Sequence, residues 1–232
     1  SVIRSSRDCV PTNVPEPVVY VTTKLAVLAA RTLDIALLEP PFDLLTRVPG
    51  RFLRRAVEFA TFADLTRLQK RTFVKPADPL DKWFDAGLYG NARDIRTCGR
   101  SCPDAPVLLS EPVEWSVELR YFVLEGRVVA GSPYLSYGRP AWRRTDASGP
   151  LPTAGRPLVE QLCADMKDRL PPVFVVDVGL IEDRGWAVVE FNPVWSAGLL
   201  NADPRAVFPA LQRASQRRTE LTDVDRRWDL RK

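Results

Sequence analysis

The chain has 232 residues, of which 45% are hydrophobic and 27% charged, as in globular proteins of one large or two small domains. It contains no histidine, which excludes Ser-His-Asp and Cys-His catalysis and most catalytic zinc sites. The formal net charge of +4 is too small to indicate nucleic-acid binding. No apolar run is long enough to cross a membrane, and Ser1 does not open a secretion leader, so we expect a cytoplasmic protein.

The chain has four cysteines, of which only two are close together in the sequence: Cys9, Cys98, Cys102 and Cys163. We expect free thiols in a reducing compartment. A zinc site built from all four cysteines is the weaker alternative.

The first third of the chain predicts short elements separated by prolines. Residues 1–17 read as extended, and residues 18–21 as a short strand. Helical spacing then covers residues 24–38 and stops at Pro40-Pro41. Thr61 is a cap for a short helix. The apolar segment Thr72–Pro76 predicts a buried strand that carries Lys75 near its end.

The middle and the end of the chain predict strands, then two helices. Residues 106–110 form an apolar strand, and residues 114–123 alternate with period two, which leaves one polar face. A hairpin turn is expected at Glu125-Gly126. Residues 155–170 read as an amphipathic helix, and Asp203-Pro204 opens a helix to about residue 213. We expect the charged tail from Ser215 to be only partly ordered.

Residues 173–193 predict a second hairpin that gathers three oxygen-bearing side chains. With Arg184-Gly185 as a two-residue loop, Asp177 lies opposite Asn192 and Gly179 lies opposite Glu190. One face then holds Asp177, Glu190 and Asn192, while the other is apolar: Val176, Val178, Leu180, Val189 and Phe191. Two carboxylates and an amide suit Mg²⁺ far better than zinc. An exposed face of surface acids is the alternative that geometry alone leaves open.

The segment from Asp177 to Glu190-Phe-Asn192-Pro193 resembles the metal-binding signature of ATP-grasp enzymes. In that superfamily an acid, a glutamate and an asparagine hold Mg²⁺ against the phosphates of ATP. The resemblance implies Asp177, Glu190 and Asn192 as metal ligands, with ATP and Mg²⁺ as cofactors and Mn²⁺ as an alternative metal.

Three further motifs follow the order of the superfamily. "FVKP" resembles the strand whose lysine, here Lys75, contacts the α- and β-phosphates. "LLSEPV" resembles the hinge between the lobes, where the Glu111 carbonyl and the Val113 N–H would bind adenine. The resemblance also implies that Glu118 binds the ribose hydroxyls and that Arg120 contacts the γ-phosphate or the acyl phosphate formed from it.

The resemblance implies an α+β, ATP-grasp fold with two α+β lobes that clasp ATP and a small N-terminal α/β pre-ATP-grasp region. We expect that region at 1–70, the N-terminal lobe at 71–110, the C-terminal lobe with the metal site at 111–214 and the charged tail at 215–232. The segments "FVKPADPLDKWFDAGLYG" and "EFNPVWSAGLLNADP" look most like a small bacterial clade of the superfamily that is named for its arginines and lysine.

The sequence departs from the D-alanine ligases of the superfamily at several positions. "ADPLDKWFDAG" replaces their Gly/Ser-rich phosphate loop, so Lys82 is the expected substitute as a point charge. Val175 stands where they have an arginine, so the oxyanion contact falls to Arg120 or Arg139. Arg55 is our assignment for an earlier lysine of the family.

Trp195 and Ser196 follow the metal-binding turn, where family members bind substrate. For the Trp195 side chain, simple packing is an equal alternative. The family implies a carboxylate–amine ligase that forms an acyl phosphate and releases ADP and phosphate. The carboxylate would come from a small molecule or a peptide, and a homodimer stays open. The alternatives are a kinase acting on a hydroxyl and a nucleotide-binding protein without turnover.

Overall fold

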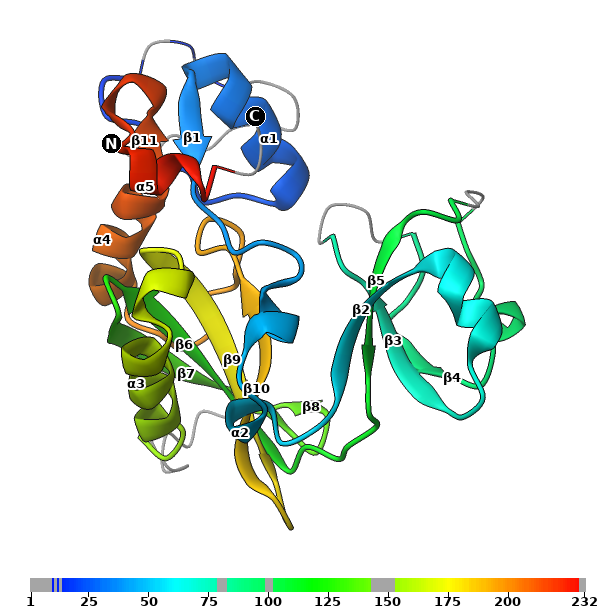
Figure 1. Ribbon diagram of the computed structural model, residues 1–232. Helices are drawn as coiled ribbons and strands as arrows, with labels where there is room; N and C mark the ends of the chain where they lie inside the picture. Colours follow the sequence, from blue (N-terminus) through cyan, green and yellow to red (C-terminus); the bar gives the residue numbers. More distant parts are fainter. Residues whose placement is uncertain are drawn as a thin grey trace.

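The computed structural model describes residues 10, 12, 14–78, 83–98, 102–142 and 153–229, which form two lobes and a terminal layer (Figure 1). Along these residues the helices are α1 (Thr23–Leu33), α2 (Gly50–Leu53), α3 (Arg156–Asp165), α4 (Pro204–Ala214) and α5 (Asp223–Arg226). Short 3₁₀ helices are η1 (Leu44–Arg47), η2 (Phe62–Arg67), η3 (Ala92–Asp94), η4 (Lys167–Arg169) and η5 (Arg218–Glu220). The strands are β1 (Ile35–Leu37), β2 (Val57–Thr61), β3 (Thr72–Pro76), β4 (Gly87–Tyr89), β5 (Pro106–Ser110), β6 (Val117–Leu124), β7 (Arg127–Ser136), β8 (Arg139–Pro140), β9 (Val173–Ile181), β10 (Gly185–Asn192) and β11 (Ser215–Arg217).

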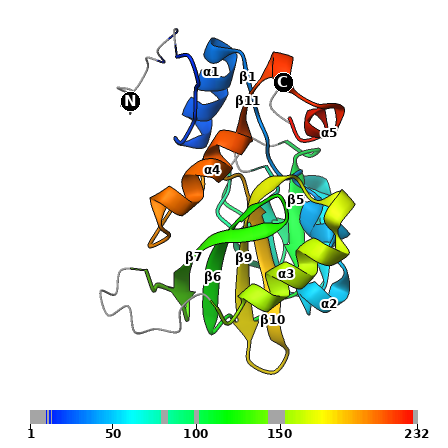
Figure 2. The same cartoon turned by 90° about the vertical axis from the view of Figure 1, so that its left-hand side faces the viewer.

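The large lobe is a five-stranded antiparallel sheet in the order β10-β9-β6-β7-β8, with a helix on each face (Figure 2). Alternation along β6 and β9 sends one set of apolar side chains toward α3, where Tyr121, Phe174 and Val178 are buried. The other set includes Phe122 and Val175, which are buried with α1 and α4. Both faces are therefore apolar where a helix covers them.

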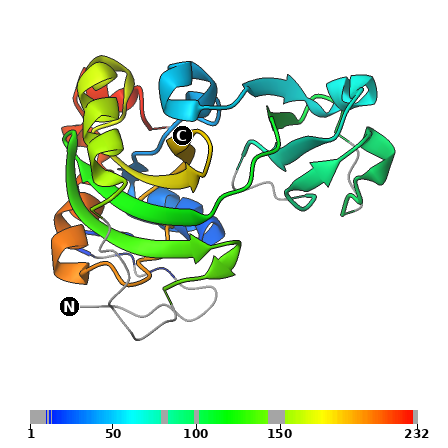
Figure 3. The same cartoon turned by 90° about the horizontal axis from the view of Figure 1, so that it is seen from below.

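The small lobe is a four-stranded sheet in the order β2-β5-β3-β4, with its own core around Val74, Trp83 and Val107. Two chain segments join it to the large lobe: residues 54–56 lead into β2, and residues 111–116 lead out of β5 (Figure 3). Because β2 pairs with β5, the small lobe begins near Val57, not after the expected boundary at residue 70.

The two ends of the described chain form a common layer. β1 pairs with β11, and Leu38 bridges to Asp229, so residues 215–229 fold against the N-terminal segment and are not a loose tail as expected. The helix expected over residues 24–38 ends at Leu33 because Asp34 adopts a left-handed conformation, and a strand follows. The strand expected at residues 18–21 does not form; that segment bonds only singly, through the Val19 N–H to Ser215 Oγ and the Val21 N–H to the Trp195 carbonyl.

The two hairpins of the large lobe close differently. Glu125-Gly126 forms the expected two-residue turn, with both residues at positive φ. The β9–β10 hairpin instead has a three-residue loop, with Gly185 at φ +84° pairing with Ile181, so the expected register is wrong. A bulge then follows between Val188 and Glu190, and Glu190 pairs directly with Asp177.

The bulge decides which side chains share a face. Without it, Val189 would stand opposite Asp177 and Glu190 would turn to the far face. With it, Glu190 and Asn192 share the face of Asp177, as the sequence predicts, although the predicted pairs differ. Val188, rather than Val189, is buried on the opposite face. Among the described helices, none combines the length and apolarity that a membrane span requires.

Candidate functional site

One face of the large-lobe sheet changes from apolar to charged along its length. The pair Phe122 and Val175 is buried in the core, and the next pair on the same face is Arg120 and Asp177. Arg120 donates from Nε and Nη2 to Oδ1 and Oδ2 of Asp177 at 2.8 and 2.7 Å, which makes a bidentate pair. Its Nη1 reaches the Gly198 carbonyl at 3.3 Å, and its guanidinium lies 4.5 Å from the centre of the Tyr134 ring.

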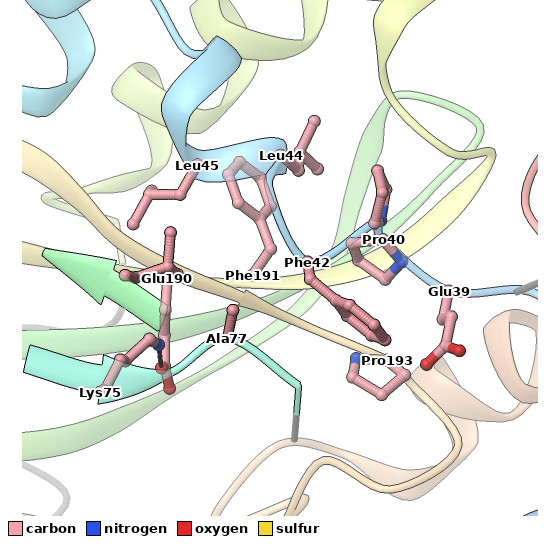
Figure 4. A pocket seen from close by; sticks show the side chains of 12 residues that line it. Glu39, Pro40, Phe42, Leu44, Leu45, Lys75, Ala77, Glu190, Phe191 and Pro193 are labelled. Atoms are coloured by element: carbon pink, nitrogen blue, oxygen red, sulfur yellow. Dashed lines mark hydrogen bonds and ion pairs between the residues drawn. The ribbon is translucent and has the colours of Figure 1, made fainter. Parts of the chain in front are cut away.

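Glu190 and Asn192 complete this group from β10. The Asn192 amide donates to Asp177 Oδ2 at 3.3 Å and to Glu190 Oε1 at 3.0 Å. From the small lobe, Lys75 on β3 reaches across and its Nζ donates to Glu190 Oε2 at 2.6 Å (Figure 4). Three candidate oxygen ligands and two cations therefore meet at one point between the lobes.

The electrostatics of the group depend on burial and on these two cations. Burial would raise the pKa of Glu190, but the Lys75 ammonium outweighs burial and lowers that pKa to about 2. Complete burial raises the pKa of Asp177, and the Arg120 pair partly offsets that rise. Burial, and then the charges of Asp177 and Glu190, raise the pKa of Glu118 to about 7. Each nearby acid therefore depends on how much positive charge it meets.

A cleft of about 940 Å³ opens beside this group. Its lining includes Phe73, Lys75 and Leu108 of the small lobe and Glu118, Val189 and Glu190 of the large lobe. The connecting segment 111–115 runs along its wall. Among the hydrogen bonds of the described residues, none engages the Val113 N–H or the Glu111 carbonyl, so both backbone groups are available to a ligand.

Three contacts fix the segments that join the lobes. The Glu111 carboxylate accepts from the Ala56 N–H at 3.2 Å and from Arg184 Nη2 at 2.7 Å. The Trp115 ring packs on Gly179, where a Cβ would lie 2.3 Å from the indole. A glycine inside an apolar strand was the sequence signal for such a close approach. Arg55 lies 4.9 Å from the centre of the Trp115 ring.

The remaining candidate residues lie in different surroundings. Trp195 is fully buried in the core, with its indole N–H donating to the Leu38 carbonyl at 3.2 Å, so its side chain does not face a substrate and packing explains it. Ser196 is half-buried, in the turn where its N–H donates to the Pro193 carbonyl. Arg139 is exposed on β8 and does not line the cleft. Lys82 lies outside the described residues.

A second, small pocket of about 40 Å³ lies beside the Lys75–Glu190 pair (Figure 4). Its walls are mostly apolar and include Phe42, Phe191 and Pro193. In Figure 4 the rings of Phe42 and Pro193 lie between the buried Glu39 and the Lys75–Glu190 pair. The same ion pair therefore borders a large cleft and a narrow apolar pocket.

The donor set fits a hard divalent cation. Two carboxylates and one amide oxygen within hydrogen-bonding reach of each other are the ligand types that Mg²⁺ takes in proteins, usually together with phosphate oxygens. A four-cysteine zinc site is not supported within the described residues, because Cys163 is buried in the large-lobe core while Cys98 and Cys102 are exposed and no cluster of metal-binding Cys, Asp and Glu is found.

Comparison with known protein families gives one match, over residues 52–210, to an ATP-grasp domain: family 2 of the clade that is named for two arginines and a lysine. That range contains both strands of the small lobe that border the cleft and the whole β9–β10 hairpin. It confirms the resemblance and the two-lobed α+β fold expected from the sequence. No curated protein matches the chain.

Solved structures with a similar fold have low sequence identity to this chain. The ATP-grasp ligase PsnB with minimal precursor, Mg and ADP has 14% identity and a TM-score of 0.37, covering 75% of this chain and 49% of PsnB. D-cycloserine synthetase DcsG has 15% identity and a TM-score of 0.43, covering 77% and 69%. Macrocyclase MdnC of Microcystis aeruginosa MRC, bound to precursor peptide MdnA, has 13% identity and a TM-score of 0.41, covering 75% and 57%. The chain thus spans about half the length of PsnB.

Proposed function

We propose that this chain, which belongs to that second family of the arginine- and lysine-named ATP-grasp clade, is an ATP- and Mg²⁺-dependent carboxylate–amine ligase. The observation that carries the proposal is the meeting of Lys75 with the group Arg120, Asp177, Glu190 and Asn192 at the edge of a nucleotide-sized cleft. An exposed face of unrelated surface acids does not account for a lysine from the other lobe bonded to the central glutamate.

The nucleotide is assigned to the large cleft. Adenine would bond to the Glu111 carbonyl and the Val113 N–H, two groups that no described residue engages. Glu118, buried on the same face as Arg120, would accept from the ribose hydroxyls. The phosphates would then extend toward Lys75, since that residue lines the same cleft.

The ion pairs would exchange partners when the nucleotide binds. Lys75 would release Glu190 and bond to the α- and β-phosphates, and Arg120 would turn from Asp177 to the γ-phosphate. Asp177, Glu190 and the Asn192 amide oxygen would then hold Mg²⁺, with Mn²⁺ as an alternative. The bound metal would supply neutralisation of the phosphate charge. Charge is conserved at the site because each cation leaves a carboxylate for a phosphate.

The chemistry that follows needs no covalent intermediate on the protein. A substrate carboxylate oxygen attacks the γ-phosphorus, the bond to the bridging oxygen breaks, and ADP leaves. Arg120 would stabilise the transferred group by a charge-assisted hydrogen bond. An amine then attacks the acyl carbon, loses a proton, and expels phosphate to leave an amide. The apolar walls of the small pocket would keep water from the acyl phosphate.

The test is ADP release from ATP in the presence of pooled carboxylic acids and amines, with and without Mg²⁺. We expect Mg²⁺-dependent turnover that Glu190→Gln reduces by at least about a hundredfold, since a metal ligand is removed. Glu182→Gln is the matched control, because Glu182 is an exposed glutamate in the loop of the same hairpin. Full metal-dependent activity in Glu190→Gln would contradict the proposed site.

The products distinguish the ligase from its alternatives. An amide with ADP and phosphate supports the ligase, whereas a stable phosphorylated acceptor identifies a kinase. Calorimetry that detects ATP binding, with no ADP released from any substrate pool, identifies a nucleotide-binding protein without turnover.

A further inference from the structure

Arg55 makes a contact that depends on the irregular pairing of β10. Its Nη1 donates to the Val188 carbonyl at 2.6 Å, and its Nη2 donates to the Val189 carbonyl at 3.0 Å. Consecutive carbonyls of a regular strand point to opposite sides, so one guanidinium cannot take both. The bulge between Val188 and Glu190 brings the two carbonyls within reach of the same side chain.

Arg55 is itself held in place by the segments that join the lobes. Its Nη1 also donates to the Leu53 carbonyl at 3.2 Å, and its guanidinium lies 4.9 Å from the centre of the Trp115 ring. β10 is the edge strand of its sheet, so no further strand is available on that side to bond these carbonyls. The contact with Arg55 therefore stabilises the bulged form of β10 over the regular form.

We infer that Arg55 is a positioning residue that holds the bulge at Val189 and so keeps Glu190 on the same face as Asp177. The inference rests on the proposed function in one respect, namely that Glu190 is a metal ligand. If Arg55 is removed, regular pairing places Val189 opposite Asp177 and turns Glu190 away from Lys75. Removal of Arg55 should then resemble removal of the Glu190 carboxylate.

The variants are Arg55→Met, which removes both donors, and Arg55→Lys, which retains a charge that bonds fewer carbonyls at once. Arg54→Met is the matched control: Arg54 is exposed and donates from Nε to the Trp186 carbonyl at 3.1 Å, on the same hairpin but before the bulge. If Arg55→Met does not fold, Arg55→Lys takes its place in both measurements below.

The first measurement is a crystal structure of Arg55→Met, which does not depend on any activity. We expect Val189 to lie opposite Asp177 and the hydrogen bond between Lys75 and Glu190 to be broken. An unchanged bulge with Glu190 still bonded to Lys75 overturns the inference. This result stands whether or not the chain proves to be a ligase, so a failure of the proposed function is separable from a failure of the inference.

The second measurement is the Mg²⁺ concentration that half-activates ATP turnover, compared across single and double variants. We expect Arg55→Met and Glu190→Gln each to raise it about 10- to 100-fold, the range for residues that orient metal ligands, with Arg54→Met unchanged. The double variant should be no worse than Glu190→Gln alone. Effects of the two substitutions that multiply would show that Arg55 acts independently of Glu190 and would overturn the inference.

Discussion

Strands β6 and β9 carry their functional side chains in a different way from β10. In β6 and β9 the alternation is unbroken, so Glu118, Arg120 and Asp177 share a face that local pattern alone specifies. In β10 the face of Glu190 depends on an inserted residue whose carbonyl is bonded by Arg55 from another part of the chain. The comparison teaches that one metal-binding group can combine residues fixed by local sequence with a residue fixed by a tertiary contact.

The largest effect is expected where the regular strands hold a buried charge. Arg120→Met leaves Asp177 fully buried without its bidentate partner, which should cost about 3–5 kcal/mol of unfolding free energy. Replacing both members, as Arg120→Met with Asp177→Leu, should recover most of that stability. Urea unfolding measures both, and a single-variant cost below about 1 kcal/mol would show that Asp177 is not held by this pair.

A second effect tests Glu118 on the same regular strand through pH. Burial raises its pKa from the ordinary 4.5 to about 7, so the folded state binds the proton more tightly than the unfolded state. Stability from this group is present below about pH 4.5 and is lost as pH rises to about 7, by up to about 3 kcal/mol. Glu118→Gln should remove that fall. Unfolding midpoints at pH 5 and 7.5 check it, and an equal fall in the variant contradicts the assignment.

A third effect concerns the close approach of Trp115 to β9. Gly179→Ala places a Cβ 2.3 Å from the indole, which must shift away from the wall of the cleft. We expect unfolding free energy to fall by about 1–3 kcal/mol and nucleotide binding to weaken. Gly50→Ala is the control, because a Cβ there meets nothing within 4 Å. Calorimetry with ATP that finds no change in Gly179→Ala would contradict the packing argument.

The smallest effect is expected at the exposed ion pair beside the hinge. Arg184→Met removes the bond to Glu111, but both side chains are partly exposed, so the cost should be at most about 1 kcal/mol. The difference from the unchanged protein should shrink further in high salt, because exposed charges are screened. A larger, salt-independent cost would place Arg184 with the tertiary contacts that matter for β10.

Much of this arrangement was predictable because the signals are local. The strand Thr72–Pro76, the turn at Glu125-Gly126 and the helix that starts at Pro204 follow from apolar pattern, turn chemistry and capping. The common face of the three oxygen ligands was also predicted correctly, but from a wrong register, since a longer loop and a bulge together restore the same parity.

The rest could not be predicted, because contacts between distant residues decide it. Trp195 is a core residue because the Leu38 carbonyl, far away in the sequence, bonds its indole N–H. Residues 35–37 are a strand, not helix, because β11 pairs with them. The contact of Arg55 with β10 joins residues more than a hundred positions apart and carries no local pattern.

The most direct test of the central claim is anomalous diffraction from Mn²⁺ in crystals grown with ADP. The account predicts a manganese peak about 2–2.4 Å from carboxylate oxygens of Asp177 and Glu190 and from the Asn192 amide oxygen, with Lys75 moved from Glu190 to phosphate. ADP bound in the cleft with no manganese between these residues, and Lys75 still bonded to Glu190, would contradict it.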